Sequence, residues 1–313
     1  MFFRQQTSAS GPRLGVDLGG SKIEIVALDA TGAELLRRRV PTPQGDYLGT
    51  ISTVTRLINE AESELGQCST VGLGIPGAES AKDGLIKNAN STCLIGHPLR
   101  RDLQTLLQRE IRLDNDANCF ALSEAIDGAG QGAEVVFGVI LGTGVGGGIV
   151  VHGQVLAGVN HIAGEWGHNP LPHGEQETLP PAICYCGRQS CIETWLSGPG
   201  LSADHARHTG TSLTPPIIAE RAELGDSDCL ATLQRYERRL AKSLAHVINI
   251  LDPEVIVLGG GLSNIERLLT QVPALWGEYI FSDQVRTRLC CNHHGDSSGV
   301  RGAAWLWGRD TRN

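Results

Sequence analysis

Three cysteines and one histidine in the middle of the chain have the spacing of a metal site. Cys184, Cys186 and Cys191 form a C-x-C-x4-C pattern, and His168 lies upstream of them. Three thiolates and one imidazole make a closed tetrahedral zinc site, which is structural because no ligand position stays open. The alternative is a set of buried thiols, because cysteine is among the most buried residues. The polar segment YCGRQS favours the metal.

Two acidic residues bracket this block, Glu165 on one side and Glu193 on the other. A closed metal site does no chemistry of its own, so its function is to position neighbours. The candidates for substrate contacts are therefore Glu165, His168 and Glu193.

Three glycine-rich turns follow predicted strands, at Gly19-Gly20, Gly142–Gly148 and Gly259–Gly261. Backbone N–H groups in such turns form concave anion sites, and glycine lets a phosphate come close. None of the turns is a P-loop or a clean dinucleotide fingerprint. With Asp17 beside the first turn, the three predict a nucleoside triphosphate with magnesium, which the carboxylate binds through water.

Asp116 lies in the motif Asn115-Asp116-Ala117-Asn118, directly after a predicted strand. Ligands commonly bind at this end of strands in α/β proteins. An aspartate there can accept the proton of a hydroxyl that attacks phosphorus. It can equally be a helix N-cap, although Asp114 and Asn115 are available for that role. The residues alone leave both interpretations open.

The elements that must position these groups alternate between strands and helices, which predicts an α/β fold with mixed sheets. Predicted strands cover residues 14–17, 23–29, 35–40, 71–75, 111–113, 137–141, 149–151, 255–258 and 285–289. Predicted helices cover 47–65, 99–110, the segment from NDAN through Glu124, 201–208, 229–251, 265–276 and 302–307.

Two segments share one pattern: GVDLGGSKIEIVALDATG and GVILGTGVGGGIVVHG both read as strand, glycine hairpin, strand and turn. This pattern predicts an internal duplication in which two halves hold a ligand between them. Two unrelated hairpins are the alternative, because glycine hairpins are common.

Composition excludes several classes of protein. The 313 residues carry a net charge of −8, which disfavours nucleic-acid binding. No apolar run approaches the ~18 residues of a membrane span. Six of the nine cysteines are scattered, so a disulfide framework is not expected and the cytoplasm is the predicted location. Residues 1–13 lack the apolar core of a signal peptide and are predicted to be a flexible leader.

Together these motifs resemble the ROK family of sugar kinases (repressor, open reading frame, kinase), within the actin-like ATPases. The matching segments follow the family's order from Leu14 to Gly308: DLGGSK at 17–22, NDAN at 115–118, LGTGVGGG at 141–148, GEWGH at 164–168, CYCGRQSCIE at 184–193 and GGG at 259–261. Ser21 stands where the family usually has threonine. KNANSTCLIGHPL at 87–99 and GEWGHNPLP are similar to the bacterial fructokinase (manno/fructokinase) branch.

The resemblance implies two actin-like (ribonuclease H-like) ATPase domains around a central cleft. The small domain would span residues 14–117, with a C-terminal helix at 301–313 packing on it. The large domain would span residues 118–300 and carry the zinc loop.

The resemblance also implies site roles. Asp116 would be the catalytic base. The residues that bind the sugar would be Asn90, Asn115, Glu165, His168 and Glu193. The residues that bind ATP and magnesium would be Asp17, Gly19, Gly20, Ser21, Lys22, Gly142, Thr143, Gly144, Gly146, Gly147, Gly259, Gly260 and Gly261. The ligands of a structural zinc ion would be His168, Cys184, Cys186 and Cys191.

The activity that the resemblance implies is ATP-dependent phosphorylation of the 6-hydroxyl of D-fructose. A kinase for glucose, mannose or N-acetylglucosamine is the alternative, and a sugar-responsive repressor of the same family without its DNA-binding domain is a remote one. The expected partner is a small hexose, with no nucleic acid and no membrane, and a homodimer is left open.

Overall fold

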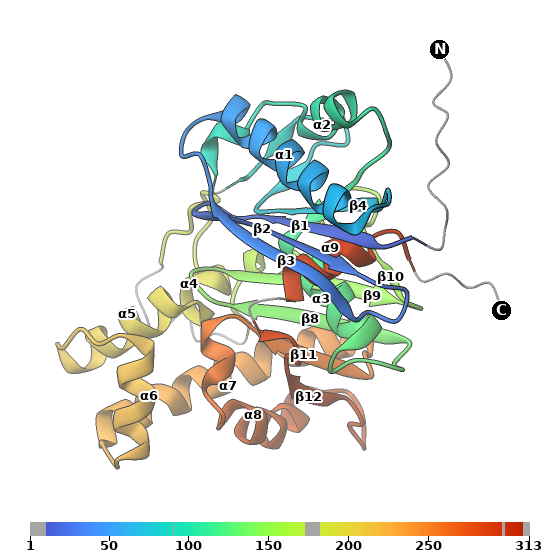
Figure 1. Cartoon of the computed structure of the whole chain (residues 1–313). Coiled ribbons are helices and arrows are strands. Elements are labelled where there is room, and N and C mark those ends of the chain that lie inside the picture. Colours follow the sequence, from blue (N-terminus) through green and yellow to red (C-terminus); the bar gives the residue numbers. More distant parts are fainter. Residues whose placement is uncertain (1–10, 90, 173–181, 296–297, 309–313) are drawn as a thin grey trace. The chain divides into compact units, whose positions relative to one another are not determined.

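The chain forms two compact units in the computed structural model, which describes residues 11–89, 91–172, 182–295 and 298–308 (Figure 1). The first unit comprises Met1–Gln131, Gly153–Ala163 and Asp296–Asn313. The second unit comprises Gly132–His152 and Gly164–Gly295. Each unit is built around one mixed sheet.

The first unit holds a mixed sheet of order β3-β2-β1-β4-β7. β1, β2 and β3 pair antiparallel, whereas β1, β4 and β7 pair parallel. The strands are β1 (Arg13–Leu18), β2 (Lys22–Leu28), β3 (Glu34–Pro41), β4 (Thr70–Ile75) and β7 (Arg112–Asn115), with a small pair β5 (Ala78–Glu79) and β6 (Ile86–Lys87). The helices are α1 (Tyr47–Leu65), η1 (Thr92–Leu94), α2 (Leu99–Leu107), α3 (Asp116–Asp127) and α9 (Ser298–Trp305).

Helix α1 has the bounds that its apolar spacing predicts, because both of its ends are marked by capping residues. The Asp46 side chain accepts from the Gly49 N–H at 2.9 Å, and Gly66 ends the helix at φ 67°. The buried face of α1 shares one hydrophobic core with the inward residues of β1 and β2.

Helix α9 lies directly on β1 and β4, and glycines make this contact possible. A Cβ on Gly72 would come within 1.8 Å of the Ala303 carbonyl oxygen, and one on Gly15 within 2.0 Å of the Val300 oxygen. The same close packing joins α9 to α3, where a Cβ on Gly302 would meet the Cys119 oxygen at 1.6 Å. The first turn of α9 therefore lies beside the end of β1, where Asp17 stands.

The second unit repeats the topology of the first. Its strands follow the order β9-β8-β11-β12, in which β8 and β9 pair antiparallel and β8, β11 and β12 pair parallel. They are β8 (Val135–Leu141), β9 (Val145–Val151), β11 (Val255–Gly259) and β12 (Arg288–Cys291). The short edge strand β10 (Gln154–Val155) belongs to the segment Gly153–Ala163, which is grouped with the first unit. The predicted internal duplication is therefore visible as a shared strand order and direction.

Helices pack on this second sheet around a core rich in leucine and aromatic residues. The longest, α7, presents an apolar face that includes Leu233, Leu240 and Leu244. The helices are η2 (Trp166–His168), α4 (Glu193–Leu196), α5 (Gly198–Thr209), α6 (Pro215–Glu223), α7 (Ser227–Leu251), η4 (Gly261–Asn264), α8 (Leu268–Trp276) and η5 (Gly277–Tyr279). No described helix combines the length and apolarity that crossing a bilayer needs.

Several predicted elements differ from the structure. The closing helix predicted at 302–307 is Ser298–Trp305, the helix predicted at 99–110 ends at Leu107, and α6 was not predicted. Three further differences have a clear physical reason. The glycine turn at 142–148 is shorter, because Gly146, Gly147 and Gly148 pair with β8 as part of β9. The helix predicted at 265–276 begins only at Leu268, after the short helix η4. The last strand is Arg288–Cys291 rather than 285–289, because its register is fixed by pairing with β11 and not by its own pattern.

Candidate functional site

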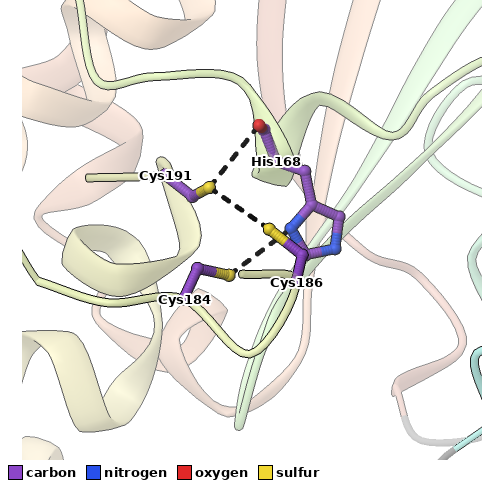
Figure 2. A group of neighbouring side chains, drawn as sticks. All are labelled: His168, Cys184, Cys186 and Cys191. Carbon is purple, nitrogen blue, oxygen red and sulfur yellow. Dashed lines mark hydrogen bonds between the residues drawn. The ribbon is translucent and has the colours of Figure 1, made fainter. Parts of the chain in front are cut away.

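The four predicted metal ligands come together in the second unit (Figure 2). His168 ends η2, and Cys184 and Cys186 belong to a tight turn. In this turn the Cys184 N–H donates to the Arg188 oxygen and the Gly187 N–H to the Cys184 oxygen, at 2.8 and 2.9 Å. Gly187 has φ 85°, which glycine adopts without strain.

The distances between these ligand atoms fit a tetrahedral zinc ion. The sulfurs of Cys186 and Cys191 are 3.7 Å apart, and the Cys184 sulfur is 3.6 Å from His168 Nδ1. All four ligand atoms lie within 4.8 Å of one another. Zinc with Zn–S bonds of about 2.3 Å would hold two sulfurs roughly 3.8 Å apart. The donor set and its spacing therefore fit a closed structural site.

Backbone pairing holds the two halves of the metal loop together. The Ile192 N–H donates to the Asn169 oxygen, and the Leu171 N–H donates to the Ser190 oxygen, at 2.8 and 2.9 Å. This pairing brings His168 beside the cysteine turn and starts α4 at Glu193. The loop of the metal site thus determines the position of the Glu193 backbone, from which the side chain extends.

Glu193 connects the metal cluster to the turn between β8 and β9. Its Oε2 accepts from the Val145 N–H at 2.9 Å, while Oε1 lies 3.7 Å from the Cys184 sulfur. A Cβ at Gly144 would come within 2.6 Å of Oε2, so glycine is needed at that position for the carboxylate to lie there.

Two glycines of β9 contact the loop that carries Glu165, and one of them, Gly147, leaves room for it: a Cβ there would meet the Gly164 oxygen at 2.8 Å. A Cβ on Gly164, which has φ 92°, would meet the Gly147 oxygen at 2.4 Å, and the Trp166 indole N–H donates to the Gly146 oxygen at 2.9 Å. Gly146 and Gly147 therefore have a packing role that the sequence analysis did not anticipate. Their nucleotide contact stays a prediction.

The other glycines of the second unit that were predicted to bind the nucleotide form two adjoining turns. Gly260 has φ 80°, and a Cβ there would meet the Leu141 oxygen at 2.5 Å, so Gly259–Gly261 lie against the end of β8. The Gly142 oxygen accepts from the Gly198 N–H at 2.7 Å, at the first residue of α5. Gly142, exposed Thr143 and Gly144 thus adjoin a helix N-terminus, a favourable place for anions that the sequence analysis missed.

In the first unit, the predicted phosphate turn joins β1 to β2. The Gly19 N–H donates to the Lys22 oxygen at 3.0 Å, and the Ser21 oxygen accepts from the Thr42 N–H. Thr42 Oγ1 donates to the Gly19 oxygen at 2.8 Å, and the Gln44 amide donates to the Gly20 oxygen at 2.9 Å. These supports come from the segment after β3, where no sequence motif marks them.

Asp116 is the first residue of α3, but Asn115 is the N-cap. The Asn115 side chain accepts from the Ala117 N–H at 2.8 Å and donates its amide to the Gly77 oxygen at 3.0 Å. Asp116 Oδ1 also accepts from the Ala117 N–H. Asp114 is engaged with the Asn118 amide at 2.7 Å. The sequence left open whether Asp116 is a helix N-cap, and in the structure the N-cap of α3 is Asn115.

Asp17 lies at the end of β1 among other carboxylates. The sheet register places it opposite Glu24, which in turn lies opposite Arg39. Burial raises the pKa of Asp17 to about 6, and the negative charges of Asp116 and Glu24 add to this effect, against the opposing influence of Lys22 and Arg39. A carboxylate held in this way gains from binding a cation, which fits the predicted magnesium role.

Replacing Asp17 by asparagine is expected to raise the free energy of unfolding at neutral pH while activity is lost. Between pH ~4 and ~6 the folded state retains a proton that the unfolded state releases, so stability falls as pH rises through this window. Above pH ~6 the destabilisation of the folded state by the ionised Asp17 carboxylate is constant, at most about 3 kcal/mol for a pKa raised by roughly two units. Urea unfolding should show that Asp17→Asn raises the free energy of unfolding more at pH 8 than at pH 5. An equal gain at both values, or a loss at pH 8, would contradict the assignment.

The predicted site residues divide between the two units. The first unit holds Asp17, Gly19, Gly20, Ser21, Lys22, Asn115 and Asp116. The second unit holds Glu165, His168, Glu193, the metal-binding cysteines and the two later glycine turns. Asn90 lies outside the described residues.

Comparison with known proteins identifies the family. The ROK family model matches residues 13–310. The N-acetyl-D-glucosamine kinase of Yersinia enterocolitica is 40% identical over 296 residues, which are 93% of this chain and 98% of that protein. Among solved structures, the ROK hexokinase of Thermus thermophilus is 29% identical with a TM-score of 0.84, covering 95% of this chain and 97% of its own. A Streptomyces griseus ROK glucokinase, solved with glucose and AMPPNP, is 27% identical with a TM-score of 0.74, covering 95% and 99%.

Proposed function

Because the chain belongs to the ROK family, we propose that it is an ATP-dependent sugar kinase that phosphorylates N-acetyl-D-glucosamine on its 6-hydroxyl. The observation that carries this proposal is the 40% identity to an N-acetyl-D-glucosamine kinase over nearly the whole of both chains. The fructose prediction rested on KNANSTCLIGHPL and GEWGHNPLP, and the comparisons do not support it. They favour the sugar that the sequence analysis named as an alternative.

In the proposed reaction, the 6-oxygen of the sugar forms a bond to the γ-phosphorus of ATP as the bond to the β–γ bridging oxygen breaks. The products are N-acetyl-D-glucosamine 6-phosphate and ADP. Asp116 accepts the proton of the 6-hydroxyl as the new bond forms. Asp116 lies at the start of α3, where Asn115 is the N-cap and where Asp116 Oδ1 also accepts from the Ala117 N–H.

We assign the binding of ATP and magnesium to Asp17 and the glycine turns. Asp17 binds magnesium through water, which balances the charges of the buried carboxylates around it. The backbone N–H groups of Gly19-Gly20 and Gly142–Gly144 bind phosphate oxygens. The turn Gly259–Gly261 lies against the end of β8 and is assigned to the adenosine.

The sugar role falls to the residues that surround the metal cluster. A zinc ion held by His168, Cys184, Cys186 and Cys191 would supply no catalytic step and would keep this loop in one conformation. Glu165, His168 and Glu193 bind ring hydroxyls together with Asn115 and Asn90. His168, Glu193 and Asn115 are half-buried and Glu165 is exposed. Polar groups that lose water when a sugar binds are selective, because a wrong sugar leaves them without partners.

A coupled ADP-release assay over a panel of hexoses tests the substrate. The panel contains N-acetylglucosamine, N-acetylmannosamine, glucose, mannose and fructose. We expect N-acetylglucosamine to give a kcat/KM at least about tenfold above each of the others. The Asp116→Asn variant, purified in the same way, is the control for kinases of the expression host. A fructose value tenfold above that of N-acetylglucosamine would restore the fructokinase assignment.

A further inference from the structure

Tyr185 stands between two metal ligands and projects its ring outward. It occupies the middle position of Cys184-Tyr185-Cys186 and is 75% exposed. Its ring meets that of His168 edge to face, with centroids 5.2 Å apart. The hydrogen bonds of the tight cysteine turn hold its backbone on both sides. A closed zinc site needs no aromatic residue at this position, so the ring has no evident part in binding the metal.

The Tyr185 hydroxyl is within hydrogen-bond distance of His168 Nε2, the ring nitrogen that faces away from the cysteines. His168 Nδ1 faces the cysteine sulfurs, and Nε2 is 3.0 Å from the Tyr185 oxygen. With Nδ1 as the metal ligand, the imidazole proton is on Nε2 and is donated to this oxygen as long as no sugar oxygen takes its place. The Tyr185 O–H hydrogen is then available for a further acceptor.

The two carboxylates assigned to the sugar belong to the same part of the second unit. Glu193 Oε1 lies 3.7 Å from the sulfur of Cys184, the residue before Tyr185, and Glu165 directly precedes the short helix that ends at His168. Tyr185 thus contacts one of the three side chains of the second unit to which the proposed function assigns the sugar, and it adjoins a residue that contacts another. It carries the only side-chain hydroxyl shown to contact any of the three in the described part of the chain.

We propose that Tyr185 is a further sugar-contacting residue of the second unit, whose hydroxyl donates to a sugar oxygen while its ring lies against the sugar. This inference rests on the proposed sugar-kinase function and adds a residue to the same site. An aromatic side chain with a polar tip suits this role, because it offers apolar surface and a directed hydrogen bond with few rotatable angles. The C-x-C spacing gives no signal for it.

The variants Tyr185→Phe and Tyr185→Ala test the proposal by separating the hydroxyl from the ring. For Tyr185→Phe we expect the KM for the sugar to rise about 3- to 10-fold, with kcat within about twofold and the KM for ATP unchanged. For Tyr185→Ala we expect a larger rise, because the ring contact is also lost. Tyr279→Phe is the matched control, since Tyr279 contacts Lys242 and Asn249 in α7.

Zinc content and sugar titration calorimetry decide between a sugar contact and a purely structural role. All variants should retain about one zinc per chain. A sugar KM that is unchanged or lower in Tyr185→Phe overturns the proposal, and so does loss of zinc from that variant. If another hexose is the better substrate, the comparison is made with that hexose, so the choice of sugar and the Tyr185 contact are judged separately. A chain that binds no hexose overturns both.

Discussion

Replacing Asp116 by asparagine should lower kcat about 10²- to 10⁴-fold, which is the usual contribution of a general base. The amide keeps the size and polarity of the carboxylate but cannot accept the proton of the 6-hydroxyl. The KM of the sugar should change only a few-fold, because its ring hydroxyls are assigned to other residues. Steady-state kinetics with purified protein measure both constants.

The fold should survive this substitution, because Asn115 caps α3 through the Ala117 N–H. Asp226→Asn is the matched control. Asp226 is a true N-cap, whose side chain accepts from the Asp228 and Cys229 N–H groups at the start of α7. Asparagine caps helices about as well as aspartate, so this control should keep both stability and kcat. A near-normal kcat in Asp116→Asn would reduce Asp116 to a residue of the first helical turn.

The sequence predicted best those features that local rules determine. The bounds of α1 follow from apolar spacing with Asp46 and Gly66 at its ends. The four metal ligands could be named because C-x-C-x4-C with an upstream histidine is a rare and chemically specific pattern. The duplicated hairpins were visible because the sequence repeats the same order of strand, glycine turn and strand.

Features set by tertiary contacts could not be predicted in this way. β12 lies three residues later than predicted at its start, because β11 determines its register. Gly146 and Gly147 looked like part of a phosphate turn, yet their neighbours are the Trp166 ring and Gly164. The contact of Tyr185 with His168 was missed because one exposed aromatic residue has no periodicity. The comparisons favour a different sugar from the one first predicted, because two short motifs do not distinguish acceptors within one family.

Removal of the metal should have the second large effect. Purified protein should contain about one zinc per chain, and Cys186→Ala should lose it, because three ligands no longer close the tetrahedron. Loss of the ion removes the constraint that keeps His168 and the cysteine turn together. The sugar then loses its hydrogen bonds to His168 and to Glu193, the two residues that the metal loop positions. Each hydrogen bond to a charged group contributes about 1.5–3 kcal/mol, so the loss of two should raise the sugar KM at least about 100-fold.

The nucleotide side of the reaction should respond much less to this substitution. Glu193 supports the β8–β9 turn through the Val145 N–H. The glycine turns of the second unit also have backbone contacts, between Gly142 and Gly198 and between Gly260 and Leu141, that include no metal ligand. The KM for ATP should therefore stay within a few-fold. Cys68→Ala is the control, because Cys68 is an exposed thiol outside the cluster and its loss should change neither zinc nor kinetics. Elemental analysis that finds a metal-free and fully active chain would show that packing alone holds Glu193 against the Val145 N–H.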